Sequence, residues 1–229
     1  MASHQLRTPL GIVKWYLEVL QKDEYIKNAP DQIKQYLAVI NKDNDRLLML
    51  VRNLLSVSRI DGGQTMNRPE MTNIVRIVEN IMEETKSMVA RRDNLELQLV
   101  LKDSAIPKTL VDPLRFHEAV ENLIANACNY TSSLGLISVT IALNKQKDAI
   151  DISVKDTGIG ISAEDQRHLF EKFFRAENAS MIDTQGSGLG LSVVKAYVED
   201  WGGKITVKSK EGRGSTFTIT VPVTTKKRV

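Results

Sequence analysis

The chain has 229 residues, of which 42% are hydrophobic and 26% charged, and its formal net charge is +3. This length allows one large domain or two modest domains, and the composition is that of a soluble globular protein. The small net charge gives no argument for nucleic-acid or membrane binding. A single cysteine, Cys128, excludes an internal disulfide and fits a reducing compartment, and no run of about 18 apolar residues exists that would span a bilayer.

The N-terminal part of the chain predicts two antiparallel helices. Apolar residues alternate at spacings of four and three from Leu6 to Leu20, which places one continuous apolar stripe on a helix. A break follows at residues 27–31, where proline and polar residues suit a connection and Asp31 can cap the next helix. The second helix keeps the heptad spacing over residues 33–58.

These apolar stripes need a further surface, because a lone helical hairpin cannot cover both of its faces. A second copy of the hairpin would complete a four-helix bundle, so we expect a homodimer; the alternative is a hairpin that folds back on the second domain. Asn44 lies in the otherwise apolar seam, where it could fix the register. Gly62 and Gly63 suit the end of the second helix, which divides the chain into domains of residues 1–62 and 63–229.

The second domain alternates between helical and strand patterns. Helices are predicted at residues 72–92, at residues 113–130 with Asp112 as the cap, and at residues 188–201. Alternating apolar residues predict strands at residues 95–101, 137–141, 150–154, 204–208 and 216–221. Ser162 to Asp165 resembles a capping box for a short helix that holds His168 and Phe170. Helices on one face of a mixed sheet make a two-layer α/β sandwich.

Five sequence blocks stand out: Ser3 to Leu10, Asn122 to Asn126, Asp156 to Gly160, Leu169 to Arg175 and Gly186 to Leu191. Their order and spacing resemble the dimerisation and catalytic core of a bacterial two-component sensor histidine kinase, which belongs to the GHKL superfamily with the Bergerat ATP-binding fold. The resemblance covers nearly the whole chain. It implies that residues 1–62 form the dimerisation and histidine phosphotransfer domain, and that residues 63–229 form the catalytic ATP-binding domain.

The block at Asp156 is expected to hold the adenine base of ATP. The strand delivers a carboxylate to a fixed point, and Gly158 and Gly160 let the main chain approach a flat ligand that a Cβ would exclude. A buried carboxylate matches an exocyclic amine, and the resemblance assigns Asp156 to the amino group of adenine. Taken alone, Asp-x-Gly-x-Gly would equally suit a simple turn. Near the end of the chain, the resemblance places the hydroxyl of Thr216 by the adenine, although a hairpin turn there would need its neighbouring glycines regardless.

A second glycine block is expected to lie against the phosphates. It lacks the Lys-Ser/Thr of a P-loop, and no ribose-binding acid follows as in a dinucleotide-binding unit. Its glycines precede a helix, whose free N–H groups and dipole favour phosphate. The phosphate-side candidates are Gly186, Gly188, Leu189 and Gly190.

Asn122 and Asn126 lie four residues apart on one helix, so both amides face the same cavity. Their neutral oxygens suit Mg²⁺, which shares its remaining positions with water and ATP phosphates. The resemblance makes Asn126 the stronger metal ligand and Asn122 its helper. The family commonly has a lysine at the position of Asn129, reaching toward phosphate, so Lys172, Arg175 or another cation would have to supply that charge.

The polar, aperiodic residues 176–185 resemble the family's mobile lid over ATP. Phe170, Phe173 and Phe174 would anchor the base of the lid against the core, and at least one of them is expected to be plain packing. Gln185, at the end of the lid, is a candidate for aiding Mg²⁺.

His4 resembles the phosphoacceptor histidine, which takes the γ-phosphoryl group of ATP. A lone histidine is more often a solvated surface residue, but Arg7, Thr8 and Pro9 follow it, and a proline within a helix costs about 3 kcal/mol. The family usually places Glu or Asp next to the histidine, whereas Gln5 can orient the ring without taking up its proton. Thr8 shares a helix face with His4, and the family uses a residue there to position the water that hydrolyses the phosphorylated regulator.

The resemblance implies an ATP- and Mg²⁺-dependent kinase that phosphorylates His4 and passes the group to an aspartate in the receiver domain of a response regulator, with phosphatase activity toward that regulator. Gln5 and Asn129 leave open a protein that is mainly a phosphatase with weak kinase activity. A GHKL ATPase module without phosphohistidine is also conceivable, but the His4 block argues against it. A dimeric binding scaffold would leave the nucleotide motifs without a use. The expected location is cytoplasmic, with a membrane reached only through a sensor region absent from this chain.

Overall fold

The computed structural model describes residues 2–41, 43–44, 47, 51, 67–89, 95–132, 134–182 and 187–223. The chain divides into two compact units, Met1–Thr65 and Met66–Val229, and each unit is described by itself. The domain boundary predicted at Gly62 and Gly63 lies outside the described residues.

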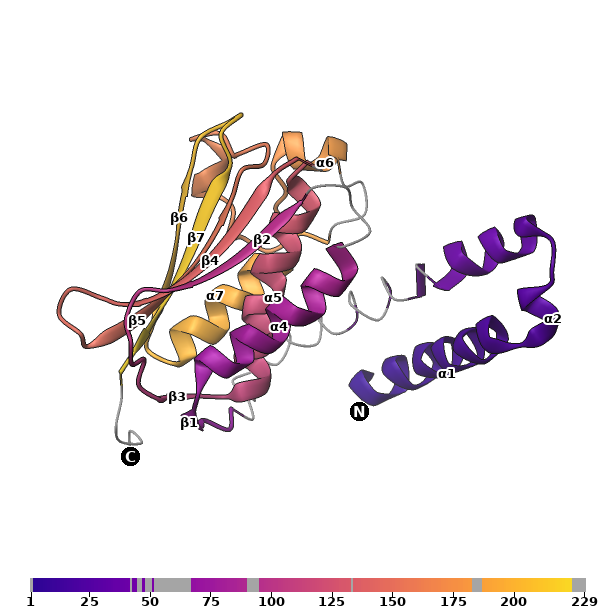
Figure 1. Ribbon diagram of the computed structural model, residues 1–229, viewed down its shortest axis with the longest axis horizontal. Coiled ribbons are helices and arrows are strands. Elements are labelled where there is room, and N and C mark those ends of the chain that lie inside the picture. The colour runs from indigo at the N-terminus through magenta and orange to yellow at the C-terminus, as the bar shows by residue number, and fades with distance from the viewer. Residues whose placement is uncertain are drawn as a thin grey trace. The chain divides into compact units, whose positions relative to one another are not determined.

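The first unit is a helical hairpin. Helix α1, Ala2–Lys22, is followed by the short α2, Glu24–Lys27, and residues 31–41 are again helical (Figure 1). The predicted break thus begins earlier than expected, at Asp23. Asp31 lies in the first turn of the next helix and is not its cap, because the preceding carbonyl, that of Pro30, accepts the N–H of Ile33 at 2.9 Å.

Asn44 joins the two long helices of the hairpin. Its side chain is only 4% exposed, and its Nδ2 donates to the main-chain oxygen of Leu10 at 3.2 Å. Lys14 Nζ donates to Asn41 Oδ1 at 3.0 Å beside it. A buried amide that must find one particular carbonyl favours one register of the helices over others.

The second unit contains a five-stranded mixed sheet with the order β2-β4-β5-β7-β6. Strands β2 and β4 pair in parallel, and the other neighbours pair antiparallel. Their bounds are Glu96–Leu101 for β2, Leu136–Leu143 for β4, Ala149–Asp156 for β5, Lys204–Ser209 for β6 and Ser215–Pro222 for β7. The last strand among the described residues, β7, therefore lies inside the sheet, between β5 and β6.

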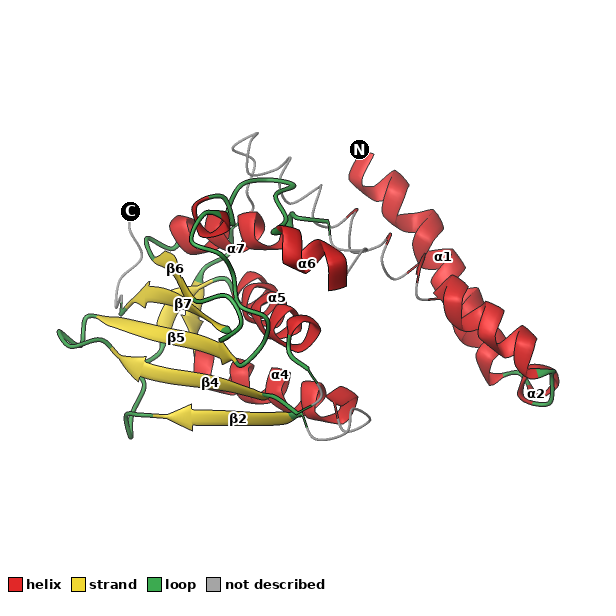
Figure 2. Ribbon diagram, turned by 90° about the horizontal axis from the view of Figure 1, so that it is seen from above, coloured by secondary structure: helices red, strands yellow, loops and turns green. Residues whose placement is uncertain are grey.

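Three helices cover one face of this sheet: α4, Ile74–Val89, α5, Pro113–Tyr130, and α7, Gly190–Asp200 (Figures 1 and 2). The core lies between the two layers, where Phe116 of α5 and Ile152 of β5 are fully buried. Burial of apolar side chains at this layer boundary is the main stabilising term of such a fold. The predicted two-layer α/β sandwich is confirmed.

A second, two-stranded sheet was not predicted. Strand β1, Glu70–Thr72, pairs antiparallel with β3, Thr109–Val111. Three residues are too few to display an alternating pattern, so the sequence carries no clear signal for either strand. This small sheet brings the segment that enters the second unit against the start of α5.

Three helix starts compare with prediction in different ways. Asp112 caps α5 as expected, because its Oδ1 accepts the N–H groups of Leu114 and Arg115 at 3.1 and 3.2 Å. Helix α4 starts at Ile74, two residues later than predicted. Ser162 Oγ accepts the N–H of Asp165 at 3.0 Å, but only a 3₁₀ turn, Asp165–Arg167, follows. The predicted helix holding His168 and Phe170 was therefore wrong, since both residues come after that turn.

Candidate functional site

Asp156 ends strand β5 on the face that the helices cover, and it is 6% exposed. Its Oδ1 accepts two main-chain hydrogen bonds, from the N–H of Gly158 at 2.8 Å and from the N–H of Ser215 at 3.2 Å. Burial raises the pKa of the Asp156 carboxyl, and the two N–H donors oppose that rise without cancelling it. The strand end thus presents a buried carboxylate in a fixed orientation.

The glycines after Asp156 are required by the chain's own packing. A Cβ on Gly158 would overlap the carbonyl of Tyr130, and a Cβ on Gly160 would overlap the carbonyl of Lys210. Gly160 also has a φ of +66°, which side-chain-bearing residues rarely adopt. The packing of the chain itself thus requires both glycines, whether or not a flat ligand also approaches them, and both lie next to the carboxylate.

Thr216 does not reach Asp156. Successive residues of a strand point to opposite faces, and Thr216 points away from the helices whereas Ser215 is buried at 6% exposure. Ser215 also contributes the N–H that Asp156 accepts. The prediction for Thr216 was wrong by one residue. The alternation of Phe217, Ile219 and Val221 was a signal that could have identified Ser215, because it places Ser215 on the buried face of the strand.

The two asparagines of α5 lie together as predicted. Asn126 Nδ2 donates to Asn122 Oδ1 at 3.2 Å, and both side chains are half-buried. Gly190, the first residue of α7, faces this pair, since a Cβ there would lie 2.5 Å from Asn122 Nδ2. The fold therefore brings the asparagine block and the second glycine block into contact. Asn129, one turn after Asn126, is exposed.

Gly188 connects the second glycine block to the phenylalanine block. Its φ is +68°, and its carbonyl accepts the N–H of Phe173 at 3.0 Å. A Cβ on Gly188 would lie 2.6 Å from the carbonyl carbon of Phe173. Leu189 beside it is 2% exposed, so its side chain belongs to the core, and any contact with phosphate would have to come from its main chain.

Phe173 does not anchor the base of the lid. It has a φ of +66°, and its side chain is 65% exposed. Leu169 and Ala176 are the residues of this stretch that are buried, at 7% and 4% exposure. Phe170 and Phe174 are half-buried. A bulky residue in the left-handed region is uncommon and is held there by its surroundings, here by its main-chain contacts with Gly188.

The first part of the predicted lid is helical. Helix α6, Glu177–Ile182, attaches to the loop after Asp156, because Asn178 Nδ2 donates to the carbonyl of Gly160 at 3.0 Å. No motif or periodicity had singled out Asn178. Lys172 is exposed and Arg175 is half-buried in the segment before α6. Gln185 and Gly186 lie outside the described residues.

The predicted phosphoacceptor block lies in the first two turns of α1, which include His4, Gln5, Arg7 and Thr8. Pro9 lies within the same helix. Among the described residues, no group of three or more His, Cys, Asp or Glu side chains is arranged to hold a metal ion. None of the described helices has the length and apolar character needed to cross a membrane.

Two family models match the chain. Residues 1–63 match the His Kinase A (phospho-acceptor) domain, and residues 111–225 match the histidine kinase-, DNA gyrase B-, and HSP90-like ATPase family. The sensor histidine kinase WalK of Bacillus subtilis is 32% identical over 220 residues, covering 96% of this chain and 35% of WalK. The sensor protein SrrB of Staphylococcus aureus is 34% identical over 221 residues, covering 96% of this chain and 36% of SrrB. The chain thus spans about a third of the length of these curated relatives.

Solved structures show the same similarity. Full-length ShkA in complex with AMPPNP superposes with a TM-score of 0.76 at 25% identity, covering 99% of this chain and 46% of ShkA. The histidine kinase AdeS of Acinetobacter baumannii superposes with a TM-score of 0.65 at 24% identity, covering 96% of this chain and 98% of AdeS, and it supports the fold alone.

Proposed function

Because the chain belongs to the sensor histidine kinase family, we propose that it transfers the γ-phosphoryl group of ATP to His4 and then passes it to an aspartate of a response regulator. The observation that carries the proposal is the buried carboxylate of Asp156, oriented by the N–H groups of Gly158 and Ser215. ShkA, the structural relative with the higher TM-score of the two, was solved with AMPPNP, an ATP analogue, which supports ATP as the ligand.

Adenine recognition falls to Asp156. The two main-chain donors both use Oδ1, so Oδ2 is the atom we assign to the exocyclic amine of adenine. The carboxylate must be ionised to accept this bond at full strength, since hydrogen bonds to charged groups contribute about 1.5–3 kcal/mol. Asn178, through the Gly160 carbonyl, positions the loop that follows the carboxylate.

The asparagine pair fits Mg²⁺ on its donor chemistry. The hydrogen bond from Asn126 Nδ2 to Asn122 Oδ1 leaves the Oδ1 of Asn126 as a neutral oxygen ligand, while Asn122 lies against Gly190. Mg²⁺ takes oxygen ligands and, when bound with ATP, would neutralise charge on the phosphates. We assign Asn126 as its ligand, Asn122 as the residue that orients Asn126, and Gln185 as a further polar group near the metal. The main-chain N–H groups at the start of α7, around Gly188 and Gly190, would face the phosphates.

The transfer itself forms a bond between an imidazole nitrogen of His4 and the γ-phosphorus as the bond to the bridging oxygen of ADP breaks. A neutral imidazole offers a lone pair for this in-line attack. The amide oxygen of Gln5 can accept the N–H of the other ring nitrogen, which orients the ring, but an amide cannot take up the proton. Lys172 and Arg175 are the candidate cations near the transferred group, because Asn129 is neutral.

The first unit provides a reason for dimerisation. Six large apolar side chains of α1 are 40–58% exposed in the single chain: Ile12, Val13, Trp15, Tyr16, Val19 and Leu20. Exposed apolar stripes of this size are typical of surfaces that a partner covers. We propose that a second copy forms a four-helix bundle with this hairpin, and that the receiver domain docks on the bundle near His4.

A response-regulator phosphatase with weak kinase activity is the second candidate function. Gln5 and Asn129 favour it, because both are neutral where the family usually has a charged residue. Thr8, one turn after His4 in α1, is the residue we assign to positioning the hydrolytic water.

The deciding experiment is incubation of the chain with γ-labelled ATP and Mg²⁺, scoring acid-labile and base-stable label. We expect label in the wild type and in His117→Ala and His168→Ala, and none in His4→Ala. Label that persists in His4→Ala would overturn the assignment of the phosphoacceptor. No label in a wild type that binds ATP, with ATP binding lost in Asp156→Ala, would overturn the kinase in favour of the phosphatase.

A further inference from the structure

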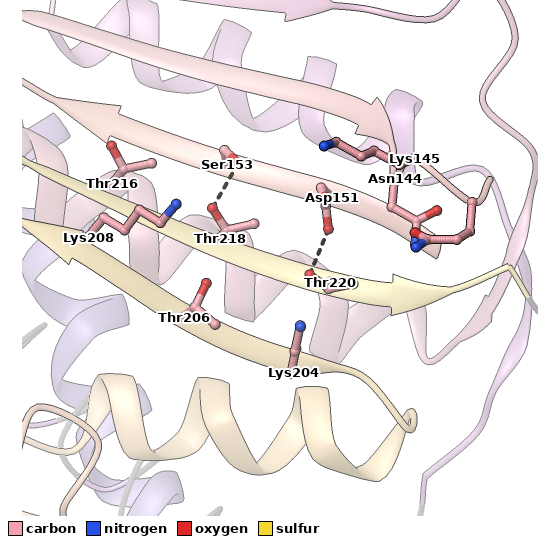
Figure 3. A pocket seen from close by; sticks show the side chains of 11 residues that line it. Asn144, Lys145, Asp151, Ser153, Lys204, Thr206, Lys208, Thr216, Thr218 and Thr220 are labelled. Atoms are coloured by element: carbon pink, nitrogen blue, oxygen red, sulfur yellow. Dashed lines mark hydrogen bonds between the residues drawn. The ribbon is translucent and has the colours of Figure 1, made fainter. Parts of the chain in front are cut away.

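One face of the sheet in the second unit is covered by none of the described helices, and this face is polar. Alternate residues of β5, β7 and β6 point to it, and together with the β4–β5 turn they form a hollow of about 560 Å³ (Figure 3). Its floor consists of hydroxyl-bearing side chains, namely Ser153, Thr206, Thr216, Thr218 and Thr220. Its rim carries Lys145, Lys204 and Lys208. We call this surface the lysine-rimmed hollow.

The floor of the hollow is held by its own hydrogen bonds. Ser153 and Thr218, paired across β5 and β7, lie 2.9 Å apart between their hydroxyl oxygens. Thr220 Oγ1 donates to Asp151 Oδ1 at 2.6 Å (Figure 3). Asp151, the acidic residue among those that line the hollow, is therefore bound to the floor and not to a lysine.

A fourth lysine belongs to the same face. Lys155 lies two residues after Ser153 on β5, is exposed, and pairs in register with Thr216. In the described part of the chain, the ammonium groups of Lys145, Lys155, Lys204 and Lys208 have neither an ion pair nor a hydrogen bond. Two carboxylates oppose these four positive charges: Asp151, and Asp148 in the β4–β5 turn, which accepts from the lining residue Asn144 at 2.6 Å. The excess of positive charge leaves the hollow with a positive field.

Protection of a sheet edge explains only part of this cluster. β6 is an edge strand, and lysines on edge strands discourage pairing with other chains. Lys204 and Lys208 fit that role. Lys155, on the central strand β5, and Lys145, in the turn before it, do not, so the four lysines need another explanation as a group.

The lining chemistry selects the kind of partner. The residues that line the hollow include no aromatic side chain and no arginine, the types on which stacked bases and permanent apolar interfaces depend. Lysine with threonine suits a polar, salt-sensitive contact with carboxylates. A concave surface also fits a convex body better than it fits the plane of a bilayer.

The lysine spacing matches one face of an acidic helix. Lys155 and Lys208 flank Thr216 on the two neighbouring strands, so their main chains lie two strand spacings apart, about 10 Å. Two carboxylates placed two turns apart on a helix are separated by about 10.5 Å. We propose that the lysine-rimmed hollow is a docking surface for an acidic helical segment of a partner protein. This inference goes beyond the phosphotransfer function and does not rest on it.

The test uses the full chain and an alanine-rich helical peptide with glutamates along one face. The variant Lys145→Gln/Lys155→Gln/Lys204→Gln/Lys208→Gln removes the rim charges. The control, Lys86→Gln/Lys102→Gln/Lys108→Gln/Lys195→Gln, makes the same charge change at lysines elsewhere in the second unit. We expect the peptide affinity at about 0.1 M salt to fall about tenfold in the first variant and less than about twofold in the control.

Further measurements separate the outcomes. Amide NMR shifts on titration are expected to centre on Ser153 and Thr218, and a peptide with Gln in place of Glu is expected not to bind. Equal losses in the two variants, or shifts that map to the helical face, would overturn the proposal. So would vesicles of phosphatidylserine or a single-stranded polynucleotide that bind through the same lysines when the acidic peptide does not. If the fourfold variant does not fold, Lys145→Gln/Lys208→Gln makes the same comparison.

Discussion

The carboxylate of Asp112 joins the start of α5 to the main chain at Arg68. Its Oδ1 caps the helix, and its Oδ2 accepts the N–H of Arg68 at 3.0 Å, from a segment 44 residues earlier. Asp112 is 7% exposed. The helix that carries Asn122 and Asn126 and the segment that enters the second unit are therefore fixed by one side chain.

Replacing this carboxylate is expected to separate the two roles. Asp112→Ala loses the cap and the bond to Arg68, so the free energy of unfolding should fall by about 2–3 kcal/mol. Asp112→Asn keeps a capping oxygen but places an amide group by the N–H of Arg68. For this variant the free energy of unfolding should fall by about 1 kcal/mol. Denaturant unfolding measures the stability of both variants. Ser162→Ala is the control, because it removes a capping hydrogen bond at a 3₁₀ turn only. Equal effects of Asp112→Ala and Asp112→Asn would contradict the role of Oδ2.

The carboxylate of Asp156 is expected to dominate nucleotide affinity. Asp156→Asn replaces a charge-assisted acceptor, so the dissociation constant of AMPPNP should rise by about 10- to 100-fold, equivalent to about 1.5–3 kcal/mol. Asp151→Asn is the matched control, because Asp151 lies on the same strand and bonds to Thr220 on the opposite face. Calorimetric titration with AMPPNP measures the affinity of both variants. Equal losses of affinity in the two variants would show that Asp156 does not belong to the nucleotide site.

The raised pKa of Asp156 predicts two opposite pH effects. As pH falls through this pKa, which lies above the ordinary 3.8, the carboxylate takes up a proton and nucleotide affinity should drop. Without nucleotide the sign is reversed. The folded state holds the proton more tightly than the unfolded state, so the contribution of Asp156 to stability is present below 3.8 and is lost as pH rises through the raised pKa. Titrations and unfolding curves across acidic pH test both signs, and Asp156→Asn should remove both dependences.

Two glycines with similar positive φ angles are expected to respond differently to alanine. Gly160 and Gly212 have φ values of +66° and +72°. A Cβ on Gly212 meets nothing within 4 Å, whereas one on Gly160 overlaps the carbonyl of Lys210. Gly212→Ala should cost only the conformational term, about 1–2 kcal/mol, and Gly160→Ala at least about 2 kcal/mol more. Thermal unfolding at matched pH would reveal the difference, and equal costs would show that the loop moves freely.

Elements with a long periodic pattern were predictable from the sequence. Helix α5 and strands β4 and β5 each bury one face, and a buried face requires apolar residues at a regular spacing in the sequence. Strands β1 and β3 were not predicted, because three residues are too few to show a periodic pattern. The face of β7 was readable from the alternation of Phe217, Ile219 and Val221, and the choice of Thr216 over Ser215 did not use that alternation.

The identity of the site residues was easier to predict than their contacts. Asp156 and the pair Asn122 and Asn126 lie where the motifs placed them, because a strand end and a helical spacing of four are local geometry. The reasons for the glycines, the exposed ring of Phe173 and the bond from Asn178 to the loop depend on segments distant in the chain. The sequence around a glycine does not show which carbonyl, from a distant segment, will pack against it.

The interior position of β7 has a consequence for synthesis of the protein on the ribosome. Asp156 receives its second N–H from Ser215, 59 residues later, and β5 gains its neighbour only when β7 has been made. At a translation rate of about 5–20 residues per second, Ser215 is synthesised about 3–12 s after Asp156. During that interval β5 is an open edge, and a nascent chain stalled before residue 215 would present it for mispairing.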